Sequence, residues 1–80
     1  MNAPLDVRPI RKRSVRLAGH RTSVSIEEPF WTELAAMAKD RGLSLDRLIA
    51  HIDRERTGNL SSAIRLYVLA ALKKQAAHDS

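Results

Sequence analysis

The chain contains no cysteine, and it has no long apolar segment. The absence of cysteine excludes disulfides, thiolate nucleophiles and cysteine-ligated zinc. The longest apolar run covers residues 66–72, whereas a membrane-spanning helix needs about 20 residues. The N-terminus is basic but lacks the apolar region of a secretory signal. We therefore expect a single small cytoplasmic domain of a bacterial type, and its 80 residues favour stabilisation by a partner chain.

Positive charge is concentrated in the first quarter of the chain. Residues 1–21 contain six basic residues and one acidic residue, whereas residues 22–80 contain eight of each. A basic segment on a charge-balanced body is typical of binding to a polyanion such as DNA, although a solubilising tail has the same composition. Two of the three prolines and little periodicity predict a flexible basic arm over residues 1–12. The candidate phosphate contacts are Arg11 and Lys12 at the end of this arm and Arg13 directly after it.

Alternating polar and β-branched residues predict a strand over residues 20–26, with a kink or bulge near Gly19. A period of two divides its side chains between an inward face, Thr22, Val24 and Ile26, and an outward face, Arg21, Ser23 and Ser25. Residues 14–17 alternate as well, but they offer residues 23–26 only a weak hairpin, so the strand needs backbone partners from a second copy. We expect an intertwined homodimer with a two-stranded antiparallel intersubunit ribbon. Its predicted core consists of Thr22, Val24, Ile26, Trp31 and Leu34.

Helical periodicity follows the strand to the end of the chain. It predicts helices over residues 28–41, 44–56 and 60–74. Pro29 suits the first turn of the first helix, and Gly42 ends that helix. Ser44 is a good N-cap for the second helix, and Asn59 or Ser61 caps the third. The predicted fold is therefore mainly α with one N-terminal strand: a domain over residues 13–72, followed by a fraying polar tail over residues 73–80.

Three segments carry a resemblance to a known family. They are the strand Arg-Thr-Ser-Val-Ser-Ile at residues 21–26, the helix with Trp31 and Leu34, and Gly-Leu-Ser at residues 42–44. In this order they resemble the ribbon-helix-helix DNA-binding proteins of the Arc and MetJ repressor class, more narrowly a small bacterial branch. The resemblance implies base contacts by the outward strand residues, in agreement with the period-two argument.

The resemblance also implies that backbone amides at the start of the second helix bind phosphate, here those of Leu43, Ser44 and Leu45. The smallest members of the family end after two helices, whereas this chain has a third predicted helix. The start of that helix, residues 59–62, is a rival phosphate cap, so the sequence leaves open which helix supplies this contact. His20 lies beside Arg21 and is a further candidate for DNA backbone contact.

Nothing in the sequence indicates catalysis. The three histidines lack the spacing of a metal site, and the serines lack a nucleophile elbow. We expect no cofactor, metal, membrane or small-molecule substrate. The predicted function is sequence-specific binding to double-stranded DNA, as a transcriptional repressor at a palindromic site. Two alternatives stay open: an antitoxin, although the polar tail after Leu72 is short for wrapping a toxin, and a helical interaction module without a DNA role.

Overall fold

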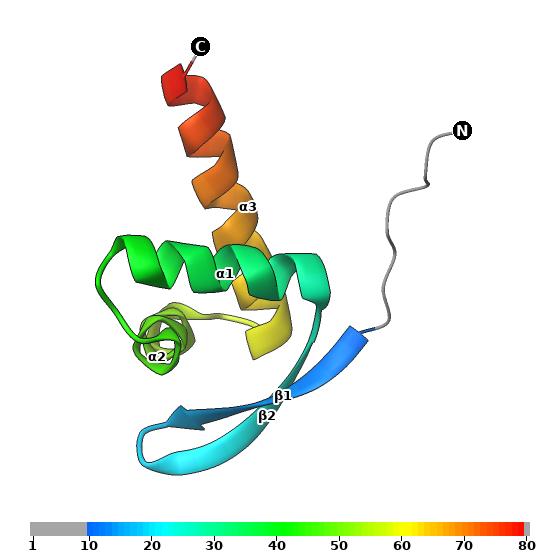
Figure 1. Cartoon of the computed structure of the whole chain (residues 1–80). Helices are drawn as coiled ribbons and strands as arrows, with labels where there is room; N and C mark the ends of the chain where they lie inside the picture. Colours follow the sequence, from blue (N-terminus) through cyan, green and yellow to red (C-terminus); the bar gives the residue numbers. More distant parts are fainter. Residues whose placement is uncertain (1–9, 80) are drawn as a thin grey trace.

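The computed structural model describes residues 10–79, which form a hairpin beneath three helices (Figure 1). The elements in chain order are β1 (Ile10–Leu17), β2 (His20–Glu27), α1 (Glu28–Asp40), α2 (Leu45–Glu55) and α3 (Leu60–Asp79). The two strands form the only sheet among these residues. The ribbon followed by helices agrees with the expected mainly helical fold.

The hairpin is a regular antiparallel pair closed by a two-residue turn. Leu17 lies opposite His20 beside the turn, and Ile10 lies opposite Glu27 at the open end. The turn residues Ala18 and Gly19 both have positive φ, 50° and 81°, as a type I′ turn requires. The prediction of a kink or bulge near Gly19 is therefore wrong, because the chain reverses its direction there in a tight turn.

The expectation of a single strand that pairs with a second copy is corrected by this hairpin. The partner of β2 is β1 of the same chain. The alternation seen at Val15 and Leu17 extends back to Ile10, so the chain itself contains a second strand of full length. Ile10, Arg11 and Lys12 thus belong to a strand and not to an arm, and residues 1–9 of the predicted arm lie outside the described residues.

The ends of α1 and α2 follow from their predicted capping residues. Pro29 lies in the first turn of α1. At the other end Gly42 has a φ of 68°. Its N–H donates to the carbonyl of Lys39 at 3.1 Å, and the N–H of Leu43 donates to that of Ala38 at 2.9 Å, which is a Schellman ending. The Ser44 hydroxyl accepts from the N–H of Arg47 at 3.1 Å and begins α2 as predicted.

The third helix is capped by Asn59 and is longer than expected. The Asn59 side-chain oxygen accepts from the N–H of Ser62 at 2.8 Å. The helix runs on to Asp79 through the segment predicted to fray. Residues 70–79 contain four alanines and neither glycine nor proline, and alanine has the highest helix propensity. No helix among the described residues combines the length and apolar character needed to cross a bilayer.

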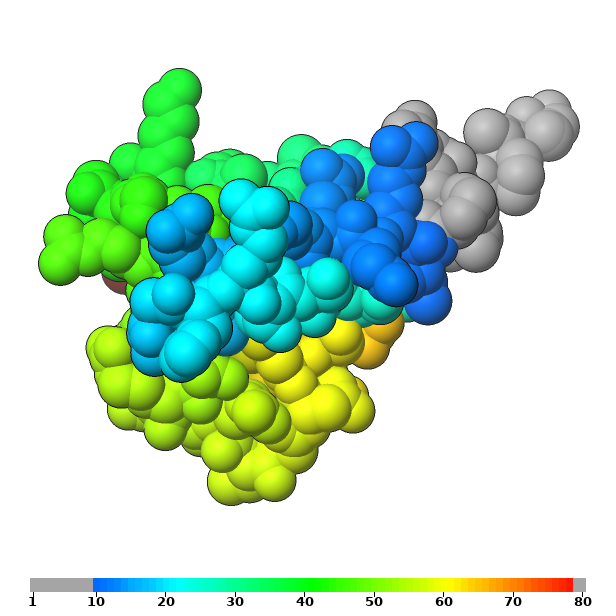
Figure 2. Space-filling view, turned by 90° about the horizontal axis from the view of Figure 1, so that it is seen from below, coloured from blue at the N-terminus to red at the C-terminus, as the bar shows by residue number. Residues whose placement is uncertain are grey.

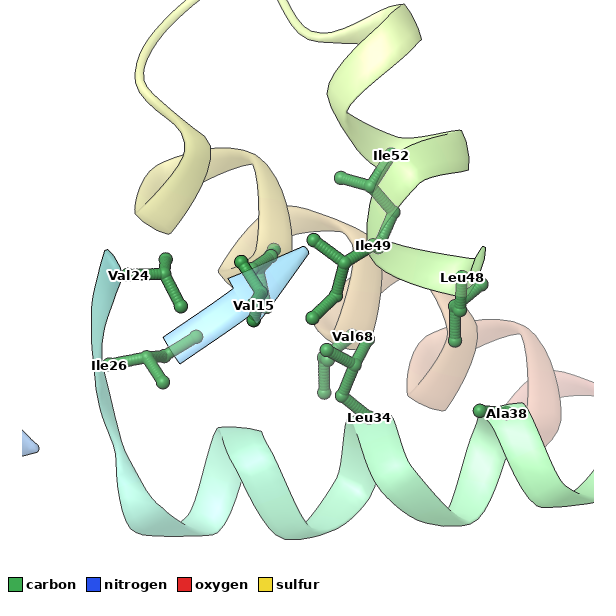
Figure 3. Close-up of a cluster of buried hydrophobic side chains, with 10 residues drawn as sticks. Val15, Val24, Ile26, Leu34, Ala38, Leu48, Ile49, Ile52 and Val68 are labelled. Atoms are coloured by element: carbon green, nitrogen blue, oxygen red, sulfur yellow. The ribbon is translucent and has the colours of Figure 1, made fainter. Parts of the chain in front are cut away.

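The core lies between the inward face of the hairpin and the three helices (Figure 3). Its buried side chains come from all five elements: Val15, Val24, Ile26, Leu34, Ala38, Leu48, Ile49, Ile52, Ile64 and Val68. Val24, Ile26 and Leu34, predicted for a dimer core, are buried within one chain. Trp31 is half-buried, and Thr22 is exposed.

Candidate nucleic-acid interface

Eight side chains lie on the outward face of the hairpin, in two rows. Because side chains alternate along a strand and opposed residues share a face, the register gives four pairs: Lys12 with Ser25, Ser14 with Ser23, Arg16 with Arg21 and, at the open end, Ile10 with Glu27. The first six of these residues are exposed. We call these six residues the ribbon face. Figure 2 views the molecule from the hairpin side, where the two strands lie across the surface.

The ribbon face contains three cations, and the carboxylate next to it on the same side of the hairpin, that of Glu27, is paired with Arg65 of α3. Lys12, Arg16 and Arg21 form no ion pair with another described residue. The predicted base-contact residues Arg21, Ser23 and Ser25 all lie on this face, as the period-two argument expected. Their exposure leaves them open to a ligand.

Two arginines predicted to contact phosphate lie on the other side of the hairpin. Arg13 is opposite Val24, and its guanidinium donates to the Glu28 carboxylate and lies 5.0 Å from the centre of the Trp31 ring. The Nε of Arg11 is 3.9 Å from Glu28 Oε1. Because the side chain of Arg13 is occupied by contacts within the chain, the structure does not place it at the ribbon face.

His20 and Thr22 lie on the same side of the hairpin as Arg11 and Arg13. His20 is opposite Leu17 beside the turn, and Thr22 is opposite Val15. Both residues are exposed although they point toward the helical side. His20 therefore lies at the rim of the hairpin, outside the ribbon face.

A helix begins at each long edge of the hairpin. At the β1 edge, the N–H of Arg16 donates to Asp46 Oδ1 of α2 at 3.4 Å. At the β2 edge, the Ser61 hydroxyl of α3 donates to the carbonyl oxygen of Ser25 at 2.7 Å. In Figure 2 the hairpin accordingly lies between the green start of α2 and the yellow start of α3. The two rival helix starts are thus both beside the ribbon, one along each edge.

The backbone amides at the start of α2 differ in what they can bind. The N–H of Leu43 is used by the carbonyl of Ala38 in the ending of α1, so the predicted phosphate contact through this amide is not supported. Ser44 and Leu45 stand at the N-cap and first position of α2. At such positions the N–H groups have no intrahelical acceptor. These two residues keep the geometry that an anion contact requires.

An ion pair between Arg65 and Glu27 joins α3 to the end of the hairpin. Arg65 donates through Nε and a terminal nitrogen to the two carboxylate oxygens of Glu27, at 2.7 and 3.2 Å. These hydrogen bonds lower the pKa of the Glu27 carboxyl below its ordinary value of 4.5. Sequence reasoning missed this pair because its members are 38 positions apart in the chain, a separation that corresponds to no local spacing rule.

Sequence reasoning also missed half of the ribbon face. Ser14 and Arg16 were not among the predicted contacts, and Lys12 was assigned to the arm. The signal that would have identified them is the Ala-Gly pair at residues 18–19 between two alternating runs, since such a pair can close a two-residue hairpin. In such a hairpin, the alternation of side chains places all three residues on the outward face, opposite Arg21, Ser23 and Ser25 of β2.

Comparison with known proteins agrees with this architecture. A family model described as "Ribbon-helix-helix domain" matches residues 10–72, which include both strands, α1, α2 and most of α3. Searches of curated proteins and of solved structures found no match. The matched segment covers well over half of the chain, and the chain belongs to the ribbon-helix-helix family, whose members are DNA-binding transcription regulators.

Proposed function

We propose that the protein binds double-stranded DNA by placing its ribbon face in the major groove, and that it acts there as a transcriptional repressor. The observation that carries the proposal is the ribbon face itself: three cations and three hydroxyls, all exposed. A two-stranded ribbon has the width of the major groove. Cations without ion-pair partners among residues 10–79 can release counterions from phosphates or donate to base edges.

The side chains of the ribbon face are suited to different contacts. The planar guanidinium of Arg21 matches the O6 and N7 acceptors of guanine, and Ser23 and Ser25 can donate to or accept from either base of a pair. The N–H groups of Ser44 and Leu45 at the start of α2 suit phosphate at the groove wall. Arg21, Ser23 and Ser25 thus remain the proposed base contacts, with Lys12 and Arg16 added from β1.

Charge removal tests this proposal directly. We expect the triple variant Lys12→Ser, Arg16→Ser, Arg21→Ser to lose most of its affinity for duplex DNA. Each phosphate contact contributes about −0.9 to the slope of log K against log salt concentration, so the loss of up to three contacts should make this slope less steep. The matched control is Arg54→Ser, Lys73→Ser, Lys74→Ser, which removes the same charge from α2 and α3. Fluorescence anisotropy at several salt concentrations measures both. Equal losses in the two triple variants would contradict the proposal.

One observation favours a second candidate function, an antitoxin or another protein-interaction module. Leu66 and Leu69 on α3 are 66% and 50% exposed, and exposed leucines are typical of contacts between proteins. Salt-sensitive retention on duplex DNA distinguishes the repressor from an interaction module without a DNA role. A pure interaction module would show no such retention, whereas a repressor would also reduce expression from a reporter that contains its site.

A further inference from the structure

A second group of cations lines a groove between α2 and the end of α1. The groove has a volume of about 430 Å³, which is within the range of about 300–1,000 Å³ that small-molecule sites occupy. Four of its lining residues carry nitrogen donors: Arg41, Arg47, His51 and Arg54. No carboxylate of residues 10–79 lines it. We call this site the arginine groove, and it offers an anion several donors without a competing carboxylate.

The donors on α2 lie on one face of that helix. Arg47, His51 and Arg54 follow one another at spacings of four and three residues, which places their side chains on the same side of a helix. The core of the protein is on another side, where Ile49 and Ile52 are buried. The three donors are exposed, so a ligand can reach all of them from solvent.

The guanidinium groups of the arginine groove are not neutralised by the described part of the chain. Arg41, Arg47 and Arg54 form no ion pair with another residue of 10–79. The guanidinium carbon of Arg41 lies 5.4 Å from the centre of the Tyr67 ring, a contact that orients the arginine and leaves its N–H groups without a carboxylate acceptor. Like charges in one groove repel each other, and a bound anion reduces this repulsion.

The arginine groove and the hairpin are on different sides of α2. In Figure 1, α2 is viewed close to its axis, with the hairpin below it and the end of α1 above it. Asp46 contacts the hairpin at the N–H of Arg16, and Arg47 is the next residue, about 100° further round the helix. The groove is shared with the end of α1. A ligand in the groove therefore occupies a separate site from the ribbon face.

The arginine groove also has an apolar part. Leu43 and Leu48 both line it; Leu48 is buried, and Leu43 is 36% exposed. Exposed apolar surface beside charged donors suits a ligand that combines a flat apolar ring with an anionic chain.

We propose that the arginine groove binds a small ligand through an oligophosphate chain, independently of DNA. Guanidinium groups bind phosphate oxygens in pairs. A single phosphate monoester carries a charge of only about −1.5 to −2, which is less than the charge of three guanidiniums, whereas a chain of two or three phosphates matches it better. Nucleoside polyphosphates and inorganic oligophosphates both supply such a chain, and only the nucleotides add a ring that can contact Leu43.

Calorimetric titration of the full chain with ATP and with inorganic triphosphate, as sodium salts and without DNA, tests the proposal. We expect saturable binding of one molecule per chain. The double variant Arg47→Ala, Arg54→Ala should reduce the affinity by about tenfold or more, because it removes two charged hydrogen-bond donors. The matched control Arg16→Ala, Arg21→Ala removes the same charge from the ribbon face and should bind both compounds like the parent chain.

The two ligands distinguish the sources of the phosphate chain. Equal affinity for ATP and triphosphate would assign the site to the chain alone, and tighter binding of ATP would add a contact between its base and Leu43; both results support the proposal. Absence of saturable binding to the parent chain would overturn it. Equal losses in the two double variants would overturn it as well, because they would indicate general attraction to a cationic protein.

A duplex titration of the same variants separates the arginine groove from the DNA interface. If Arg47→Ala, Arg54→Ala loses as much duplex affinity as Arg16→Ala, Arg21→Ala, the groove is part of the DNA contact and the proposal of an independent site is wrong. Circular dichroism of each variant verifies the fold. Because all four side chains are exposed, we expect unchanged spectra.

Discussion

Arg16 and Arg21 lie directly opposite each other on the two strands of the hairpin, and both are exposed. Opposed residues that are not joined by backbone hydrogen bonds have Cα atoms only about 4.5 Å apart in antiparallel sheets. Two like charges in this position destabilise the pair. A polyanion placed over them would reduce the repulsion, so this pair fits the proposed contact with DNA.

Relief of this repulsion by mutation should stabilise the protein. We expect Arg16→Thr to raise the free energy of unfolding by about 0.2–1 kcal/mol while it weakens duplex binding. Urea denaturation measures the stability, and Ser14→Thr is the control for the strand propensity of threonine at an exposed position of the same strand. If both variants gain equally, charge repulsion between Arg16 and Arg21 does not contribute.

Arg21 should contribute to sequence preference and not only to general attraction. We expect Arg21→Ala to cost about 1–3 kcal/mol of binding free energy on the preferred duplex, and less on a random duplex. Titration of both duplexes gives the difference. Lys74→Ala is the charge-matched control, because it lies on the part of α3 that projects away from the hairpin (Figure 1). Equal losses on the two duplexes would show that Arg21 contacts backbone alone.

Substitution of the two turn residues should change the stability of the protein in opposite directions. Ala18 has a φ of 50°, where an alanine is strained, so Ala18→Gly should stabilise the protein by up to about 1 kcal/mol. Gly19→Ala should destabilise it by about 1 kcal/mol. Apart from its two chain neighbours, no described residue has an atom within 4 Å of a Cβ added at Gly19, so we attribute that cost to the backbone conformation. Thermal unfolding of both variants measures the effects, and two shifts of the same sign would contradict the turn assignment.

Burial of the Ile26 side chain should contribute several kcal/mol to the free energy of unfolding. The residue has no exposed surface, whereas Ile10 on the other strand is 54% exposed. We expect Ile26→Ala to lower the free energy of unfolding by about 2–5 kcal/mol and Ile10→Ala to change it little. Denaturation at two protein concentrations adds a second test. A midpoint that rises with concentration would show that association with a second chain adds to the stability.

The Glu27–Arg65 pair should make stability depend on pH in acid. Because the hydrogen bonds from Arg65 lower the pKa of Glu27 in the folded state, the pair stabilises the protein above the ordinary carboxyl pKa of 4.5. This stabilisation is lost as the pH falls through the lower folded-state pKa. Glu27→Gln should reduce the acid-induced loss, as measured by urea denaturation from neutral pH downward. Glu33→Gln, an exposed change on α1, should leave the loss as in the parent chain.

The helices and the parity of β2 were predictable because they depend on local rules. Pro29, Gly42 and Ser44 mark the helix ends by their own backbone and side-chain chemistry, and alternation alone places Val24 inward. The same alternation correctly turned Arg21, Ser23 and Ser25 outward.

The partner of β2 and the long-range contacts were not predictable in this way. Prolines at the start of the chain concealed the strand that begins at Ile10, and Ala18 is an unusual residue for positive φ. The occupied guanidinium of Arg13 depends on the position of Glu28, which is 15 residues away. Only the folded chain brings these groups together.

The two-residue turn has a kinetic consequence. A hairpin closed by so short a connection forms on a timescale of about 1–10 μs, by a step within one molecule. The rate of this step does not depend on the number of copies in the cell. The ribbon face therefore forms inside each chain, before that chain meets DNA.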